Sequence, residues 1–341
     1  MFTELTNSKH NATIRSALLY TFGLISAWGC NLTSPVFGVL VALPLVAAQD
    51  FSITVLIKRY ALQATYIVSG LMIGEMFAKS GFLVFACSVA ILGFSIYRVN
   101  RWQQATSMPT MIFYYLFAVV NTSYGTSVEH SLYSLIESMM IQLPVGWLIF
   151  KLLPSPKNNK KTSEANQCFT IEDKNFSFLV VTLTLLVFLL VDLTTSIFCA
   201  LVVSGCAFSI SKKALLTNIK NIVPIQVGGC LIGLGVNVIM FADIDNMIWA
   251  TGVLLLLVAF YLFFANNQHL RLSEREDNNY ENDILRAALV PLSLYTSPDG
   301  LYLSSYFHRS IDMLVTAVLM LSLYLLVRHC RELSPSNSRF T

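Results

Sequence analysis

Long apolar segments follow one another along almost the whole chain and constrain its fold more than any other feature. We identify twelve such segments, and several of them are shorter than the roughly 20 residues that an upright helix needs to cross a bilayer. Their apolar residues come in unbroken runs rather than in alternation, which favours helices over membrane strands. The segments span residues 14–31, 33–50, 60–78, 81–98, 108–124, 131–153, 176–192, 194–210, 221–241, 247–265, 284–296 and 309–328.

Charge is too scarce for a water-soluble protein of this length. Only 12% of the 341 residues are charged and 55% are hydrophobic, whereas an ordinary soluble domain carries about 25% charged residues. The formal net charge is only +3, and nucleic-acid binding would need a clustered basic face. The composition therefore predicts an all-α polytopic membrane protein whose first partner is the lipid bilayer, with no nucleic-acid partner.

The basic residues indicate how the segments are oriented. If the N-terminus is cytoplasmic and the segments alternate in direction, every Lys and Arg except Lys79 and Arg309 falls on the cytoplasmic side. Cytoplasmic loops are enriched in these residues, and a miscounted segment would invert every later loop. The pattern predicts about twelve transmembrane helices with cytoplasmic N- and C-termini.

Two short matches indicate an internal repeat. Residues 32–41 (LTSPVFGVLV) align with 193–202 (LTTSIFCALV), and 69–74 (SGLMIG) align with 228–233 (GGCLIG), at nearly the same spacing. Both pairs fall in the second and third segments of a six-segment half. Because six is even, the halves enter the membrane in the same direction and form a parallel repeat, as in many secondary transporters. We expect two six-helix halves, 1–153 and 176–341, joined by a cytoplasmic linker, 154–175.

Paired glycines occur at matching places in the two halves. Gly70 and Gly74 in one half, and Gly229 and Gly233 in the other, remove side-chain bulk from one helical face. Such faces let helices approach closely in a membrane. We expect packing within the chain; a moving interface or a dimer seam is the alternative, which leaves a homo-oligomer open.

The fifth segment of each half is short and ends in Thr-Ser followed by turn-forming residues. Interrupted segments at matching positions of two halves indicate a transporter's substrate site; the alternative is a pair of ordinary short helices that end at the outer surface. The segment 284–296 also contains Pro291. The substrate-binding candidates are the hydroxyl and amide residues Asn121, Thr122, Ser123, Tyr124, Thr296 and Ser297, and the aromatic residue Tyr114 with its neighbours Phe113 and Tyr115.

Three of the carboxylates within the apolar segments are candidates for proton coupling. A charge at mid-bilayer costs roughly 2.5–3.5 kcal/mol on insertion scales, so such residues usually face a cavity or a partner. Glu137 and Asp312 occupy similar places near the start of each half's last segment, where they could bind and release protons. Glu75 is a third proton-coupling candidate. For Glu75 and Asp312, local pairing with Lys79 and Arg309 is the preferred interpretation, whereas Glu137 has no basic residue within a helical turn.

Motifs for catalysis and metal binding are missing from the sequence. No GxSxG, HExxH or P-loop occurs, so we expect no enzymatic activity and assign no catalytic residue. The 7 cysteines are scattered without a CxxC, and the 5 histidines are isolated from one another. No metal site and no cofactor are therefore expected, and the cysteines act as small hydrophobes.

An Arg leads the first segment (13–18, TIRSAL), a tight hairpin leads to 32–44 (LTSPVFGVLVALP), and the last segment opens with 309–312 (RSID). The order of these features resembles the fusaric acid resistance family, which includes the aromatic acid exporters of bacterial inner membranes. Two six-helix halves fit as well. The large cytoplasmic domain between the halves of bigger members is missing, so the chain looks like a compact variant.

The resemblance implies a multi-pass protein of the bacterial inner (plasma) membrane that exports small organic acids, aromatic ones above all, or drugs. It also implies a periplasmic adaptor and an outer-membrane channel as partners, and with the intramembrane carboxylates it leads us to expect proton coupling. Related plant anion channels keep a passive anion channel as an alternative. A non-transporting membrane scaffold is the third interpretation. No substrate-binding residue is carried over from the family.

Overall fold

Helices make up nearly all of the described chain, as the unbroken apolar segments predict. The computed structural model describes residues 2–48, 50–126, 128–154, 168–190, 197–208, 216, 219–243, 246–266, 279–297, 300–301 and 303–332. Within these residues the only strands are β1 (Thr296–Ser297) and β2 (Gly300–Leu301), which pair antiparallel in a two-residue hairpin. The protein is therefore all-α in architecture.

Each of the twelve apolar segments contains at least one helix. Residues 1–153 form α1 (Phe2–Gly29), α2 (Val36–Leu40), α3 (Leu43–Val46), α4 (Ile53–Met76), α5 (Gly81–Tyr97), α6 (Trp102–Ala105), α7 (Met108–Ser123) and α8 (Glu129–Leu152). Later residues form α10 (Ile171–Leu190), α11 (Cys199–Ala207), the π-helix η2 (Val223–Val227), α13 (Gly228–Met240), η3 (Phe241–Asp243), α14 (Met247–Asn266), α15 (Asn279–Tyr295) and α16 (Leu303–Glu332).

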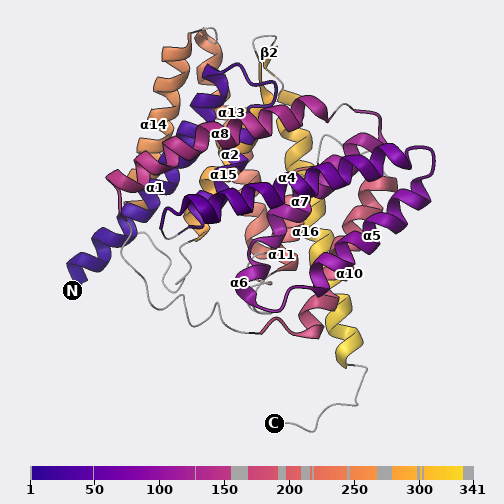
Figure 1. Ribbon diagram of the computed structural model, residues 1–341. Helices are drawn as coiled ribbons and strands as arrows, with labels where there is room; N and C mark the ends of the chain where they lie inside the picture. The colour runs from indigo at the N-terminus through magenta and orange to yellow at the C-terminus, as the bar shows by residue number, and fades with distance from the viewer. Residues whose placement is uncertain are drawn as a thin grey trace.

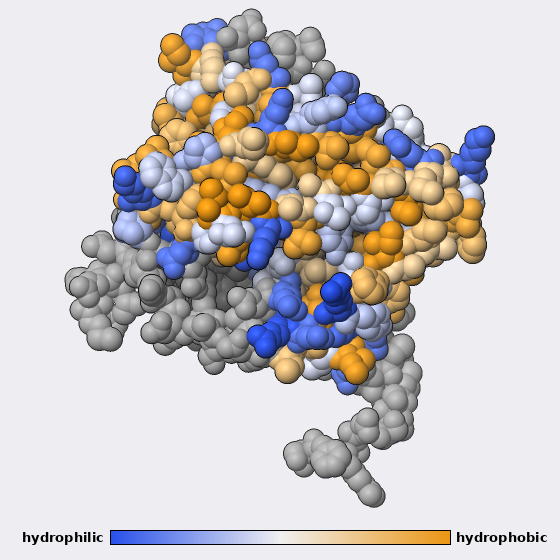
Figure 2. Space-filling model, in the orientation of Figure 1, coloured by the Kyte–Doolittle hydropathy of each residue, from blue (hydrophilic) through white to orange (hydrophobic). Residues whose placement is uncertain are grey.

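Three described helices are long and apolar enough to cross a membrane. They are α8, α10 and the continuous run Ile219–Asp243, which contains η2, α13 and η3. Large apolar side chains also cover much of the outer surface (Figure 2); Ile248 is 85% exposed and Phe82 is 77% exposed. A water-soluble monomer rarely exposes large apolar patches. The long apolar helices and this surface together indicate a membrane protein.

The helix α7 lies at the centre of the molecule. Every side chain from Met111 to Val120 is buried, and α4, α5, α10 and α11 pack around the helix. A helix that is apolar on all sides is stable only where other elements surround it. The Tyr115 hydroxyl of α7 donates a buried hydrogen bond to the Ser88 hydroxyl of α5 at 2.9 Å. The sequence of α7 thus explains its central position.

The paired glycines pack helices together within the chain, as predicted. A Cβ atom on Gly70 would lie 2.6 Å from the Tyr115 carbonyl oxygen, so α4 rests directly on α7. A Cβ on Gly229 would lie 2.5 Å from the Ala287 Cβ, so α13 rests equally closely on α15. Gly74 and Gly233 make the next contacts along the same two seams, with Thr122 and with the Ala288 carbonyl.

The break in helix geometry falls in the second segment rather than in the fifth. Segment 33–50 divides into α2 and α3, and Pro44 stands in the first turn of α3, where a missing N–H group is tolerated. The fifth segments form continuous helices, α7 and α15, and α15 accommodates Pro291 within its length. The helical part of both segments therefore agrees with the alternative of ordinary helices rather than with interrupted ones.

Helices from the two parts of the chain interleave. At one end of the molecule α1 packs against α14, and at the other end α10 packs against α5, with α4 and α7 between them (Figure 1). Nearer the middle, α2 contacts α15 and α11 contacts α7. Residues 155–167 of the predicted linker lie outside the described residues, but its end is fixed, because Cys168 pairs with Arg101 and Phe169 packs on Trp102.

Lys174, at the start of α10, joins that helix to the end of α5. Its ammonium group donates hydrogen bonds to the Tyr97 carbonyl oxygen (2.9 Å) and the Asn100 side-chain oxygen (3.1 Å), and the side chain is 8% exposed. We expect Lys174→Met to destabilise the protein by about 1.5–3 kcal/mol, the usual value for hydrogen bonds to a charged group. Thermal unfolding in detergent measures the change. Lys58→Met, on an exposed lysine of α4, is the matched control; equal effects of the two substitutions would contradict the prediction.

Candidate functional site

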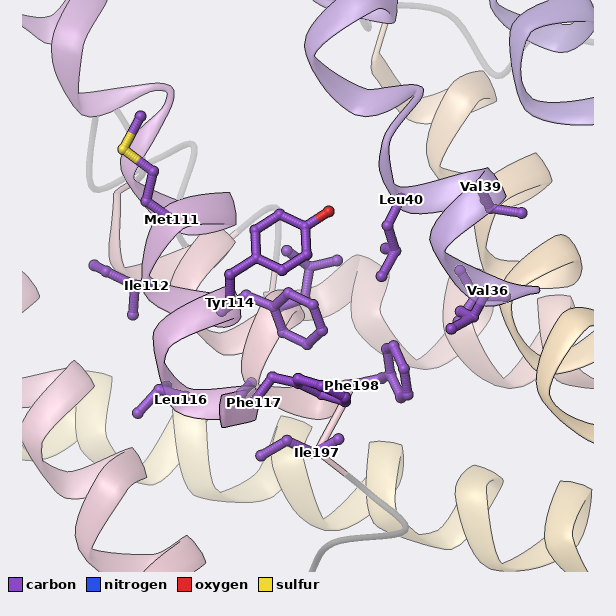
Figure 3. Packing of buried hydrophobic residues seen from close by; sticks show 14 of the residues in the cluster. Val36, Val39, Leu40, Met111, Ile112, Tyr114, Leu116, Phe117, Ile197 and Phe198 are labelled. Atoms are coloured by element: carbon purple, nitrogen blue, oxygen red, sulfur yellow. The ribbon is translucent and has the colours of Figure 1, made fainter. Parts of the chain in front are cut away.

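A cluster of aromatic rings lies where the two parts of the chain meet. Phe113 and Phe117 of α7 contact Phe198, just before α11, with ring centroids 5.5 and 6.3 Å apart. Phe117 also meets Phe37 of α2 edge to face, at 5.6 Å. Tyr114 points from α7 toward Leu40 of α2, and Phe117 lies beside Phe198 (Figure 3). Offset and edge-to-face geometries of this kind are the favourable ones. We call Phe37, Phe113, Tyr114, Phe117 and Phe198 the aromatic cluster.

A buried arginine borders the aromatic cluster. Arg309, two turns inside α16, is 4% exposed, and its guanidinium carbon lies 5.6 Å from the centre of the Phe198 ring. The guanidinium also interacts with Tyr295 and Cys230. Its Nη1 atom is buried without a hydrogen-bond partner among the described residues. A cation at this distance from an aromatic face is attracted to it, but one set of its donors stays unsatisfied.

A small hollow opens beside Arg309. Its wall includes Phe198, Gln226 of η2, Arg286 of α15 and Val290. Gln226 is 8% exposed. Arg286 forms an ion pair with Asp283 at 3.0 Å. The hollow has a volume of about 10 Å³, which is room for about one water molecule. Its polar groups are therefore close together and mostly donors.

Four substrate-binding candidates follow one another at the end of α7, and their side chains bond locally. Asn121 and Ser123 donate to the backbone carbonyls of Phe117 and Val119, one turn earlier. Tyr124 donates to the Leu189 carbonyl oxygen at 3.2 Å. Thr122 packs on Gly74, and its hydroxyl is buried without a hydrogen-bond partner among the described residues.

The other substrate-binding candidates lie elsewhere. Thr296 donates to the Leu292 carbonyl and contacts the Asn237 side chain of α13, and Ser297 is in β1, where its backbone alone is described. Tyr114 is fully buried in the aromatic cluster, and its hydroxyl lacks a hydrogen-bond partner among the described residues. The structure thus brings Tyr114 to the centre of the molecule but does not gather the seven candidates into one site.

The three acidic candidates differ in their surroundings. Glu137 of α8 and Glu75 of α4 have exposed side chains. Asp312 of α16 is half-buried and lies one turn beyond Arg309. The charges of Asp312 and Arg309 both interact electrostatically with the Cys199 thiol. Of the three, Asp312 is therefore the carboxylate that lies near Arg309, although it is not among the residues that line the hollow.

Sequence reasoning overlooked Arg309, Gln226 and Phe198. It placed Arg309 at the outer edge of the last apolar segment, whereas α16 begins six residues earlier, at Leu303, so that Arg309 lies inside the helix. The start of α16 is hidden in the sequence because its first turns contain Ser304, Ser305 and His308. The importance of Phe198 could have been predicted, because it is aligned with Phe37 in the internal repeat.

Neither a metal site nor a similar protein adds to this description of the site. Among the residues that the structure describes, no group of three or more His, Cys, Asp or Glu side chains is placed to hold a metal ion. The sequence matches no known family, and neither a curated protein nor a solved structure matches it.

Proposed function

We propose that the protein is an inner-membrane transporter that exports small organic acids, aromatic ones above all. The observation that carries this proposal is the reciprocal packing of the two halves around the aromatic cluster. The second element of each half packs on the fifth helix of the other half: α2 on α15, and α11 on α7. A pathway between two similar halves is the common plan of secondary transporters.

The same reciprocity extends to other helices and supports the proposal of a twelve-helix parallel repeat, whose cytoplasmic termini are proposed from the distribution of Lys and Arg alone. The first helix of each half packs on the fourth of the other half, α1 on α14 and α10 on α5. The glycine seams join the third helix to the fifth in both halves. Phe37 and Phe198, which are equivalent in the repeat alignment, both contact Phe117. Two equivalent arrangements of this kind are expected of halves that move against each other.

Transport by purified protein in sealed vesicles tests the proposal. Vesicles that contain the protein and radiolabelled benzoate are given a proton gradient, and benzoate movement is followed with and without an uncoupler. We expect movement that depends on the protein and stops when the gradient collapses. Movement that persists with the uncoupler favours a passive anion channel, and the absence of any protein-dependent movement favours a non-transporting scaffold. A periplasmic adaptor and an outer-membrane channel belong to the proposal as partners and are tested by co-purification.

Asp312 is the carboxylate that we propose for proton coupling, because it lies beside the buried cation. Asp312→Asn is expected to abolish the acceleration of benzoate transport by a proton gradient, while benzoate exchange across vesicles without a gradient continues. Glu137→Gln, at the equivalent place in the first half but on an exposed face, is the matched control and should leave both activities unchanged. The opposite outcome, with loss in Glu137→Gln alone, assigns coupling to Glu137.

A further inference from the structure

We propose that Arg309 and Gln226 bind the carboxylate of a small organic acid whose ring lies against the aromatic cluster. This site belongs to the proposed transport function. It rests on that function for one point, that the bound acid is also the transported acid. Arg309 comes from α16 and Gln226 from η2, and Phe198 is the member of the aromatic cluster that lines the same hollow. The site is thus at the junction of the two halves.

The charge balance of the hollow favours an anion. Arg309 is 4% exposed and keeps a buried Nη1 without a hydrogen-bond partner among the described residues. A second guanidinium, from Arg286, lines the same hollow, and the charge of Arg286 is matched by Asp283 at 3.0 Å. A buried cation is costly unless an opposite charge and hydrogen bonds compensate it. Both charged side chains that line the hollow are therefore cations, and one donor group of Arg309 has no acceptor among the described residues; Asp312 lies one turn along α16 and is not part of the lining.

The chemistry of the guanidinium favours a carboxylate in particular. Its planar pair of N–H donors matches two carboxylate oxygens, and such bidentate hydrogen bonds are among the strongest in proteins. The amide of Gln226 offers a further donor in the same wall. Gln226 stands on the π-helix η2, Val223–Val227, within an otherwise α-helical run. Single π-turns of this kind often occur at functional sites, since they redirect a side chain.

The ring of the acid has a surface to lie on. Phe198 lines the hollow and continues into Phe113 and Phe117, and aromatic rings prefer offset or tilted contact with other rings. The hollow as it stands holds about one water molecule. An acid therefore displaces that volume and spreads the side chains of the wall.

A second buried arginine provides a matched control. Arg15 of α1 is 5% exposed, lies 4.4 Å from the Phe150 ring and also keeps a buried Nη1 without a partner among the described residues. It donates instead to the Ala48 carbonyl oxygen and does not line the hollow. Removing either charge disturbs a similar environment, but only Arg309 faces the proposed site.

Equilibrium binding of radiolabelled benzoate to the full-length protein in lipid nanodiscs tests the site. We expect saturable binding to the wild-type protein and to Arg15→Gln, and at least about tenfold weaker binding to Arg309→Gln, as the loss of a charged hydrogen bond implies. Arg309→Lys should restore part of the affinity, because it keeps the charge without the planar donor pair. Acetate is expected to compete less well than benzoate, because it lacks a ring.

Each other result overturns part or all of the proposal. Wild-type affinity in a folded Arg309→Gln protein, or no benzoate binding by the wild type, overturns the site. If Arg309→Gln does not fold, Gln226→Leu decides the matter, since unchanged affinity in that variant also overturns it. Equal competition by acetate overturns the aromatic subsite alone. Binding in nanodiscs needs no gradient, so the site and the transport function can fail separately. Benzoate binding that depends on Arg309, without flux in vesicles, refutes transport and keeps the site. Flux that Arg309→Gln leaves unchanged refutes the site and keeps transport.

Discussion

Gly229→Leu is expected to leave little correctly folded protein. A side chain at this position must enter the seam between α13 and α15, where the nearest atoms would be Cβ, C and O of Ala287, at 2.5, 2.6 and 2.7 Å. Two of these atoms are helix backbone, which cannot turn aside as a flexible side chain does. The cost therefore exceeds the roughly 1–3 kcal/mol of an ordinary over-packed core, and marginally stable proteins do not tolerate such losses.

Size-exclusion profiles and thermal midpoints in detergent measure this effect. Gly235→Leu lies on the same helix, where nothing stands within 4 Å of an added Cβ, and should behave like the wild type. Gly70→Leu should repeat the loss at the equivalent seam between α4 and α7. If Gly229→Leu and Gly235→Leu have the same midpoint, the close approach of α13 and α15 is not a feature of the folded protein.

Phe198→Ala is expected to cost about 3–5 kcal/mol, the usual range for truncation of a buried Phe. The ring is 6% exposed and contacts Phe113 and Phe117 as well as the Arg309 guanidinium. Its removal leaves a cavity at the junction of the two halves and also takes away the face on which the buried cation rests. Both losses act in the same direction.

Thermal unfolding in detergent compares this variant with Phe82→Ala. Phe82 begins α5 and is 77% exposed, so its truncation removes a similar side chain from the outer surface and should change the midpoint little. Phe37→Ala, at the equivalent position of the first half, should approach the effect of Phe198→Ala. Similar midpoints for Phe198→Ala and Phe82→Ala would show that the aromatic cluster does not stabilise the fold.

Much of the fold could be predicted because apolar runs and glycine spacing are local signals. A run of apolar residues specifies a helix wherever it packs, and the seams at Gly70 and Gly229 follow from the missing Cβ atoms alone. The division of segment 33–50 into α2 and α3 was less visible, because a proline in the first turn of a helix and one that breaks a helix look alike in a sequence.

The candidate site was harder to predict because it is assembled from distant residues. Arg309 and Gln226 come from separate helices, and each lies beside polar or proline-containing sequence that reads as the edge of an apolar segment. The consecutive amide and hydroxyl side chains of residues 121–124 suggest a binding site in the sequence. A Ser or Asn at the end of a helix, however, often donates a hydrogen bond to the carbonyl one turn back. Ser123 and Asn121 do so.

The interleaving of the halves has a consequence for how the chain is made. The helices α2 and α8, which pack on α1, come from the same half, but two further partners, α14 and α15, come from the other half, and more than two hundred residues of synthesis separate Gly29 from Met247. At about 5–20 residues per second, the ribosome needs roughly 10–45 seconds to deliver them. During that interval the part of α1 that α14 and α15 will cover has no native neighbour, so the newborn protein depends on lipid, or on the insertion machinery, to cover it. Final assembly is therefore a late event, completed only when the last helices arrive.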